Sequence, residues 1–225
     1  DFTITDEYGK EIKAQMVTRK HDGAYWNLWV ENVPSFGYKQ YFIETHDRKE
    51  ISAKNNFSGD FNSVSNEWYE LKINEKRGTL ESIFDKEIGR NILEESSEWK
   101  FGELIHEKLD SRFLDRKVME GYARKVPANM KFTGYSHGEL WDTYSFAGHS
   151  EAGIGDGDNM NVEFRVYNCA KRIDVHFGLT KKLDTNPEAV YVAFPFALPD
   201  AKIYFDVPGG VIEAGVDQIQ GTSND

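Results

Sequence analysis

The clearest structural signal in the chain is Val162-Glu163-Phe164-Arg165-Val166-Tyr167-Asn168-Cys169-Ala170-Lys171-Arg172-Ile173-Asp174-Val175-His176-Phe177-Gly178-Leu179. Apolar and polar side chains alternate through this stretch on both sides of a short turn at residues 168–171. Successive side chains of a β-strand point to opposite faces, so an alternation with a period of two predicts strands that are apolar on one face. The stretch therefore predicts an antiparallel β-hairpin.

A second hairpin is predicted over residues 69–85. Tyr69, Leu71 and Ile73 alternate with polar neighbours, and the turn that follows ends on Gly78. Glycine supplies the positive φ that such a loop needs. One face of this hairpin is apolar and the other is polar, as expected for an antiparallel sheet that covers a core.

The rest of the chain is also rich in strand signals. Residues 110–122 form the best helix candidate, because Phe113, Leu114, Val118 and Met119 share helical spacing. Further strands are expected over residues 26–30, 38–43, 101–108, 141–146, 191–198 and 203–207. Many strands with tight turns favour an all-β fold: an antiparallel β-sandwich with a small N-terminal β unit and one short helix.

A polar segment at residues 47–65 separates two β-rich parts of the chain. It is rich in Asn, Ser, Asp and Gly and has few apolar residues, which favours a linker. We therefore expect a small β domain over residues 1–46 and a β-sandwich domain over residues 66–225.

Composition limits the classes of function. The chain has 225 residues and a formal net charge of −11, which repels a polyanion such as DNA, so we expect no nucleic-acid partner. The single cysteine, Cys169, excludes an intrachain disulfide and a zinc–cysteine cluster. No apolar run approaches the roughly 18 residues of a membrane-spanning helix, so a soluble chain without a membrane partner is expected. The compartment cannot be deduced from these residues.

The best candidates for sugar contacts are Trp141, Asp142 and Tyr144. The aromatic rings would stack on a sugar face while the carboxylate accepts protons from hydroxyl groups. The alternative is that Trp141 packs in the core and Asp142 faces water, because strands alternate between inside and outside.

A possible zinc ligand set surrounds this segment. His137 and His149 flank it, with Glu139, Asp142 and Glu151 nearby, and imidazole and carboxylate groups are zinc ligands. The histidines do not have the spacing that places two imidazoles on one helical face. Ordinary surface histidines are therefore the favoured interpretation, and no zinc site is predicted here.

The loop that contains Asp156, Asp158 and Asn159 offers oxygen ligands for calcium. It lacks the distal glutamate and the flanking helices of an EF-hand, so a solvated loop is favoured.

Two further features have simple structural interpretations. Gly209–Gly210 is read as a tight turn. Asp174 and His176 share one face of a strand and could transfer a proton, but surface packing is the favoured alternative.

Several short phrases occur in the order typical of one enzyme family. They are Val33-Pro34-Ser35-Phe36-Gly37-Tyr38, Asn66-Glu67-Trp68-Tyr69, Pro187-Glu188-Ala189-Val190-Tyr191-Val192-Ala193-Phe194-Pro195-Phe196 and Asp206-Val207-Pro208-Gly209-Gly210-Val211. Through these phrases nearly the whole chain resembles the β domains of glycoside hydrolase family 38 α-mannosidases. The resemblance implies a C-terminal domain of the galactose mutarotase-like supersandwich type.

The resemblance also implies a chemistry. Members of this family are retaining α-mannosidases in which zinc, held by His and Asp residues, binds sugar hydroxyls and an Asp carboxylate attacks the anomeric carbon. The zinc ligands and the nucleophile lie in an N-terminal α/β domain, and none of their motifs occurs here. No catalytic, cofactor-binding or metal-binding residue is therefore assigned, and zinc is expected only in a longer parent protein.

We expect the chain to be a piece of that parent, since it begins at Asp1 without methionine and stops at Asp225, where family members continue with more strands. Its expected partners are the catalytic domain of the same polypeptide and an α-mannoside substrate, and an oligomer is compatible with the sequence. The alternative functions are a carbohydrate-binding or structural β-sandwich without hydrolase activity, and a stand-alone mutarotase-like epimerase.

Overall fold

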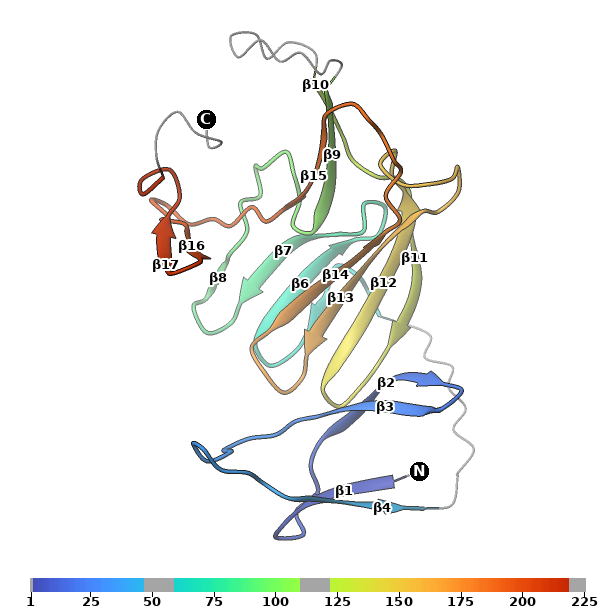
Figure 1. The fold of residues 1–225 in the computed structure, drawn as a ribbon, viewed down its shortest axis with the longest axis vertical. Coiled ribbons are helices and arrows are strands. Elements are labelled where there is room, and N and C mark those ends of the chain that lie inside the picture. Colours follow the sequence, from blue (N-terminus) through green and yellow to red (C-terminus); the bar gives the residue numbers. More distant parts are fainter. Residues whose placement is uncertain (1, 47–58, 110–121, 219–225) are drawn as a thin grey trace. The chain divides into compact units, whose positions relative to one another are not determined.

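The computed structural model describes residues 2–46, 59–109 and 122–218 (Figure 1). Within these ranges every regular element is a β-strand, and all the pairings between strands are antiparallel. The chain separates into two compact units, Asp1–Pro195 and Phe196–Asp225. No described helix is long and apolar enough to cross a membrane.

Two four-stranded sheets form the centre of the first unit. The first has the order β5 (Val64–Ser65), β6 (Tyr69–Asn74), β7 (Thr79–Asp85) and β8 (Arg90–Asn91). The second has the order β11 (Ala128–Ser136), β12 (Trp141–His149), β13 (Met160–Tyr167) and β14 (Ile173–Leu179). Each sheet follows the order of the chain, because each strand turns back onto its predecessor.

One hydrophobic core joins these two sheets. Phe146 and Phe164, in adjacent strands of the second sheet, are fully buried, with ring centroids 6.2 Å apart. Leu71 and Leu80 of the first sheet belong to the same buried cluster. Burial of apolar side chains from the inner faces of two sheets is what holds a β-sandwich together. The predicted all-β sandwich is therefore confirmed.

A third sheet in the first unit has the order β10 (Tyr122–Lys125), β9 (Glu103–Leu109) and β15 (Glu188–Ala193). β9 and β15 lie about 80 residues apart in the sequence, and their register pairs Lys108 with Glu188 and His106 with Val190. This pairing brings charged side chains from distant parts of the chain together.

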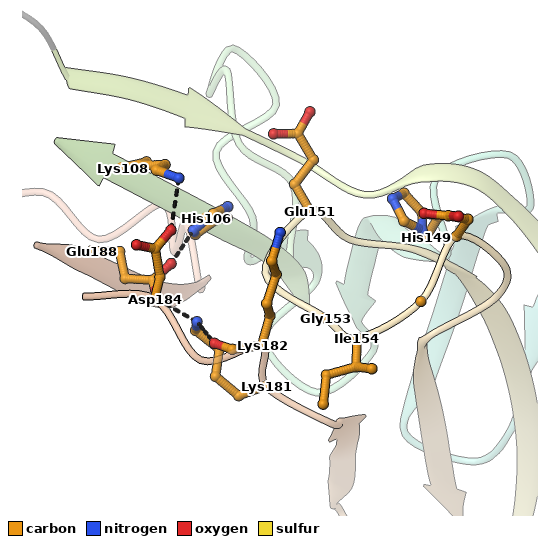
Figure 2. Close-up of a pocket in the computed structure, with 12 residues that line it drawn as sticks. His106, Lys108, His149, Glu151, Gly153, Ile154, Lys181, Lys182, Asp184 and Glu188 are labelled. Atoms are coloured by element: carbon orange, nitrogen blue, oxygen red, sulfur yellow. Dashed lines mark hydrogen bonds and ion pairs between the residues drawn. The ribbon is translucent and has the colours of Figure 1, made fainter. Parts of the chain in front are cut away.

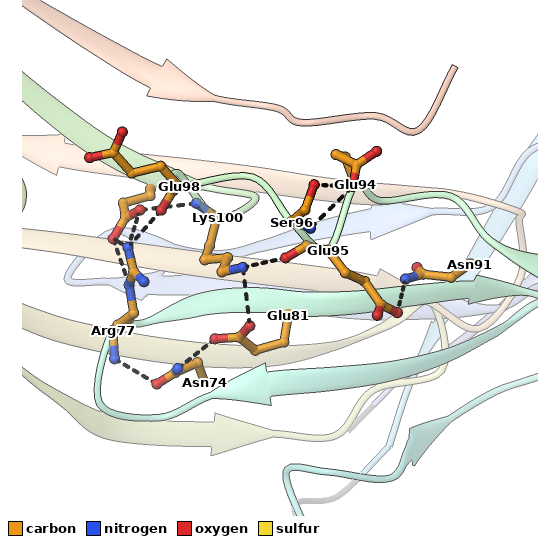
Figure 3. A network of polar contacts seen from close by, with 10 residues as sticks. Asn74, Arg77, Glu81, Asn91, Glu94, Glu95, Ser96, Glu98 and Lys100 are labelled. Atoms are coloured by element: carbon orange, nitrogen blue, oxygen red, sulfur yellow. Dashed lines mark hydrogen bonds and ion pairs between the residues drawn. The ribbon is translucent and has the colours of Figure 1, made fainter. Parts of the chain in front are cut away.

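A polar network fixes the segment between β8 and β9 (Figure 3). Arg77 donates three hydrogen bonds of 2.6–2.8 Å to the buried carboxylate of Glu103, which also accepts one from the backbone N–H of Lys100. The ammonium group of Lys100 donates to the carbonyl oxygen of Glu95. Charge-assisted bonds of this kind hold the irregular segment against the β6–β7 turn.

The N-terminal part consists of two antiparallel strand pairs. β1 (Phe2–Asp6) pairs with β4 (Tyr41–Thr45), and β2 (Ala14–Lys20) pairs with β3 (Gly23–Leu28). Many of its large apolar side chains are exposed, and Phe36 is fully exposed.

The second unit, described as far as residue 218, contains one hairpin, β16 (Tyr204–Val207) with β17 (Gly210–Glu213). Pro208 and Gly209 connect the strands, and Gly209 has a φ of 94°. Proline followed by a residue with positive φ is the pattern of a type II turn. The tight turn predicted at Gly209–Gly210 forms one residue earlier in the structure, at Pro208 and Gly209, and Gly210 begins β17.

Both hairpins predicted from side-chain alternation are also confirmed. Residues 69–85 form β6 and β7, with a φ of 62° at Gly78, and residues 162–179 lie in β13 and β14. The helix expected over residues 110–122 falls on residues 110–121, outside the described residues, and Tyr122 begins β10. The described ranges contain no helix, so the short helix is not confirmed. The domain limits at residues 46 and 66 stay a prediction.

Candidate functional site

A pocket of about 390 Å³ lies beside the third sheet (Figure 2). Its volume falls within the range of small-molecule sites. The lining comes from β9, from the start of β15 and from the loops that follow β12 and β14. We call it the β9–β15 pocket, and it is lined by His106, Lys108, His149, Glu151, Gly153, Ile154, Gly155, Asp156, Lys181, Lys182, Asp184 and Glu188.

A buried histidine–glutamate pair forms one wall of this pocket. His106 Nε2 lies 2.8 Å from Glu188 Oε2, and the two side chains are 5% and 13% exposed. The β9–β15 register places them diagonally on neighbouring strands, within reach of each other. The ammonium group of Lys181 donates to the other oxygen of Glu188. Glu188 therefore lies between a histidine and a lysine.

These partners change the acidity of Glu188. The hydrogen bond from Lys181 lowers the pKa of the Glu188 carboxyl group, burial raises it, and the hydrogen bond from His106 lowers it further, with a net lowering. A cation that donates to a carboxylate stabilises the ionised form. Glu188 is therefore a carboxylate at neutral pH, and a carboxylate accepts hydrogen bonds.

A second ion pair lies beside the first. Lys108 Nζ is 2.7 Å from Asp184 Oδ2. The hydrogen bond from Lys108, together with one from the backbone N–H of Asn186, lowers the pKa of Asp184 to about 2. In Figure 2 the side chains of Lys108, Asp184, His106 and Glu188 lie close together. The cluster alternates donors and acceptors, of which His106, Lys108 and Glu188 belong to the sheet and Asp184 to the segment before β15.

The opposite side of the pocket is formed by the loop after β12. Glu151 accepts hydrogen bonds from Lys125, whose Nζ lies 2.7 Å from Oε1, and this interaction lowers the pKa of Glu151. His149 Nδ1 lies 2.9 Å from the carbonyl oxygen of Gly157. Asp156 and Lys182 also line the pocket. The pocket therefore presents charged groups of both signs.

The predicted sugar-contact residues lie in a different part of the fold. Trp141 is 4% exposed and packs against Leu140 and Tyr167, while Tyr144 is 3% exposed and belongs to the sandwich core. Burial raises the pKa of the Tyr144 hydroxyl, and the neighbouring Tyr135 and Asp142 raise it further. Both aromatic rings are enclosed by protein, so neither offers an open stacking face in this structure.

Asp142 is partly exposed and already has several partners. Its oxygens lie 2.7 Å from His137 Nδ1, 3.2 Å from the Tyr135 hydroxyl and 3.1 Å from the Asn168 side-chain amide. Burial and this carboxylate raise the pKa of Tyr135 to about 12. A carboxylate has about four acceptor positions, so Asp142 has little capacity left for a sugar hydroxyl. Sugar contact by these residues stays a prediction.

The candidate metal ligands are dispersed. His137 contacts Asp142 at the start of β12, whereas His149 is the last residue of that strand. Such a strand spans roughly 25 Å, far beyond the reach of a single zinc ion. Within residues 2–46, 59–109 and 122–218, no group of three or more His, Cys, Asp and Glu side chains could hold a metal ion.

The acidic loop and the Asp174–His176 pair are also engaged within the protein. The Asn159 side chain bonds to the backbone of Ser150 and Gly155, and Asp158 pairs with Lys131. Asp174 pairs with Arg172 and accepts a hydrogen bond from the Tyr167 hydroxyl. No hydrogen bond between Asp174 and the exposed His176 is found in the structure.

Sequence reasoning missed the β9–β15 pocket. His106 and Glu188 are 82 residues apart, and only the pairing of two strands brings them together. One signal was available, because His106 directly follows the apolar residues Leu104 and Ile105 near the end of a predicted strand. A polar side chain in a buried strand needs a partner, but the sequence does not say which.

The comparison with known families agrees with this fold. The sequence model for "Glycosyl hydrolases family 38 C-terminal domain" matches residues 64–223. This match covers most of the chain and begins with β5, the first strand of the sandwich. The chain therefore belongs to glycosyl hydrolase family 38, as the resemblance of its short phrases predicted. A search of curated proteins finds no match to it.

Proposed function

We propose that this chain is the β-domain part of a zinc-dependent, retaining α-mannosidase, in which it supports the catalytic domain and shapes the sugar cleft without supplying reacting groups. The observation that carries the proposal is the family match over residues 64–223, because the matching family is defined as a C-terminal domain. A C-terminal domain of a glycoside hydrolase implies a partner domain and a glycan substrate.

The donor groups in the described part of the chain do not fit zinc. A catalytic zinc ion needs three protein ligands that converge on one point and leave one position open. In the described part of the chain no such group exists, and His106 Nε2 in the β9–β15 pocket is already bound to Glu188. No catalytic step is assigned to these residues, and in this proposal the zinc ligands and the nucleophile belong to the catalytic domain.

Exposed apolar side chains support a docking role. In the N-terminal part Tyr8 is 86% exposed, Tyr38 is 83% exposed and Ile43 is 65% exposed. Large exposed apolar groups of this kind are common where a protein contacts another domain. In this proposal the catalytic domain covers them, and the β9–β15 pocket contributes hydroxyl-binding groups to an outer part of the sugar cleft.

The test uses the full polypeptide that the gene encodes and an aryl α-mannoside as substrate. We expect hydrolysis that is lost on treatment with a chelator and is restored by added Zn²⁺, with retention of the anomeric configuration. Thermal unfolding of the isolated 225-residue chain should not change on chelation, since the donor groups of residues 2–46, 59–109 and 122–218 do not converge on a metal ion. Hydrolysis that is insensitive to the chelator would contradict the zinc assignment, and an inverted product would contradict the retaining mechanism.

A second candidate function is a carbohydrate-binding β-sandwich without hydrolase activity. The β9–β15 pocket favours it, because its charged groups are arranged for hydrogen bonding. The same assay separates the two functions. A full polypeptide that binds α-mannosides without hydrolysing them, with and without Zn²⁺, would favour the second.

A further inference from the structure

The outer face of the first sheet carries an ordered row of side chains. Strand register pairs Ser65 with Glu70, Glu70 with Phe84, and Phe84 with Asn91, so this row crosses all four strands from β5 to β8. Residues paired across neighbouring strands project from the same face of a sheet. Glu70 is exposed, whereas its neighbour Leu71 is buried, so the row lies on the face opposite the core.

This row lies along a groove. The hollow has a volume of about 550 Å³, within the range of small-molecule sites. Besides the row, it is lined by Lys72 and Ser82, which are also paired in register, by Glu95 from the segment after β8, and by Asn62, Ser63 and Leu71. All these groups belong to the first unit and lie apart from the β9–β15 pocket.

Phe84 is the unusual member of the row. Its neighbours in the chain, Ile83 and Asp85, are buried on the inner face, so the Phe84 ring belongs to the outer face. The ring is partly exposed and lies among hydroxyl, carboxylate, amide and ammonium groups. An apolar surface surrounded by polar groups is the arrangement of a binding site in which one side of the ligand is apolar.

The polar groups near this ring are held in place. The Asn91 side-chain oxygen accepts hydrogen bonds from the backbone N–H groups of Ile83 and Leu93, at 3.0 and 3.2 Å, which fixes its amide. That amide donates to Glu95 Oε1 at 2.8 Å, as Figure 3 shows. Each carboxylate oxygen accepts more than one bond, so Glu95 retains acceptor capacity. Groups that are ordered before binding lose less entropy when a ligand arrives.

The charges around the groove nearly cancel. Glu70 and Glu95 are acidic, Lys72 is basic and exposed, and Lys86 Nζ lies 3.8 Å from Glu70 Oε1. Two carboxylates beside two ammonium groups give no net attraction for a phosphate or another anion, and the single ring offers too small an apolar area for a lipid chain. A pyranose matches the apolar Phe84 ring and the polar groups around it. It has an apolar C–H face and a rim of hydroxyl groups that donate and accept hydrogen bonds.

We propose that this groove binds a pyranose unit of a neutral glycan, with the sugar's C–H face on the Phe84 ring and its hydroxyl groups on Glu70, Lys72, Ser82 and Glu95. Binding there needs no catalytic domain, so the inference goes beyond the proposed function. It gives the β-sandwich a sugar-binding surface of its own.

The test measures binding of methyl α-D-mannopyranoside and methyl α-D-glucopyranoside to the 225-residue chain by saturation-transfer difference NMR and titration. We expect a dissociation constant on the order of 1 mM for at least one of them, as a single sugar makes few contacts. Phe84→Leu keeps an apolar side chain but removes the ring face, and should weaken binding about tenfold, equal to about 1.4 kcal/mol. Glu95→Gln keeps an acceptor for Asn91 and should weaken binding by a smaller factor.

The matched control is Tyr191→Leu, which removes an exposed aromatic ring on β15 outside the groove. It should bind the sugars as the unmodified chain does, and thermal unfolding should show that all the variants fold. The proposal is overturned if neither pyranoside binds, or if Phe84→Leu binds as tightly as the control. Since no substrate is hydrolysed in this experiment, its outcome is independent of the mannosidase assay.

Discussion

Replacing Glu188 with alanine should destabilise the chain more than the loss of an ordinary surface ion pair. Glu188 is 13% exposed and accepts hydrogen bonds from His106, which is 5% exposed, and from Lys181, which is 37% exposed. After the substitution Lys181 can turn to water, whereas His106 keeps a buried polar nitrogen without this partner. Most of the lost stability should therefore come from the buried His106 side chain.

The expected magnitude follows from that one contact. A hydrogen bond to a charged group contributes about 1.5–3 kcal/mol, and a buried polar group left without a partner costs about 1–3 kcal/mol. We expect Glu188→Ala to lower the free energy of unfolding by about 2–3 kcal/mol. Glu188→Gln keeps an oxygen that accepts from His106 and should cost only about 1 kcal/mol.

Urea unfolding followed by tryptophan fluorescence measures this difference, as a shift in midpoint at constant slope. The matched control is Glu87→Ala, since Glu87 is 72% exposed and also pairs with a lysine, Lys171. An exposed pair contributes only about 0–1 kcal/mol, so the control should change little. If Glu188→Ala and Glu87→Ala shift the midpoint equally, His106 and Glu188 do not form a buried pair that stabilises the fold.

Two further predictions concern the charged groups of the sandwich. The Lys108 hydrogen bond lowers the pKa of Asp184 from 3.8 to about 2, so the pair's contribution to stability is complete above pH 3.8 and is lost as the pH falls toward 2. Asp184→Asn should flatten the stability-versus-pH curve in that window, and an unchanged curve would contradict the ion pair. Arg77→Ala leaves the Glu103 carboxylate, which is 3% exposed, with only the Lys100 backbone N–H, and should cost about 3 kcal/mol in urea unfolding. The double variant Arg77→Met/Glu103→Met should recover much of this loss, whereas a double variant less stable than Arg77→Ala would contradict the mechanism.

Local features of the fold could be predicted from the sequence because they depend on neighbouring residues. Alternation in residues 69–85 and 162–179 fixes which side chains share a face, and Gly78 supplies the turn that connects β6 to β7. The pairing of β9 with β15 could not be predicted in the same way. It joins segments about 80 residues apart. The residues next to His106 and Glu188 in the sequence do not indicate that these two segments pair.

The sugar-contact prediction shows a second limit of sequence reasoning. Alternation says that Trp141 and Asp142 face opposite sides of a strand, but it does not say which side is covered. In the structure Trp141 packs on Tyr167, with ring centroids 5.2 Å apart, and the Gln15 side chain bonds to the Trp141 backbone from the N-terminal part. Segments that are distant in the sequence thus cover some aromatic side chains, and this decides which of them remain accessible to a ligand.

The most direct measurement for the proposed function is the turnover of an aryl α-mannoside by the isolated 225-residue chain, with and without added Zn²⁺. We predict no turnover above the uncatalysed rate in either condition, because the described residues provide neither a converging metal-ligand set nor an assigned nucleophile. Turnover by the isolated chain that disappears in Asp142→Asn would contradict this, and would place the reacting carboxylate inside the β-sandwich.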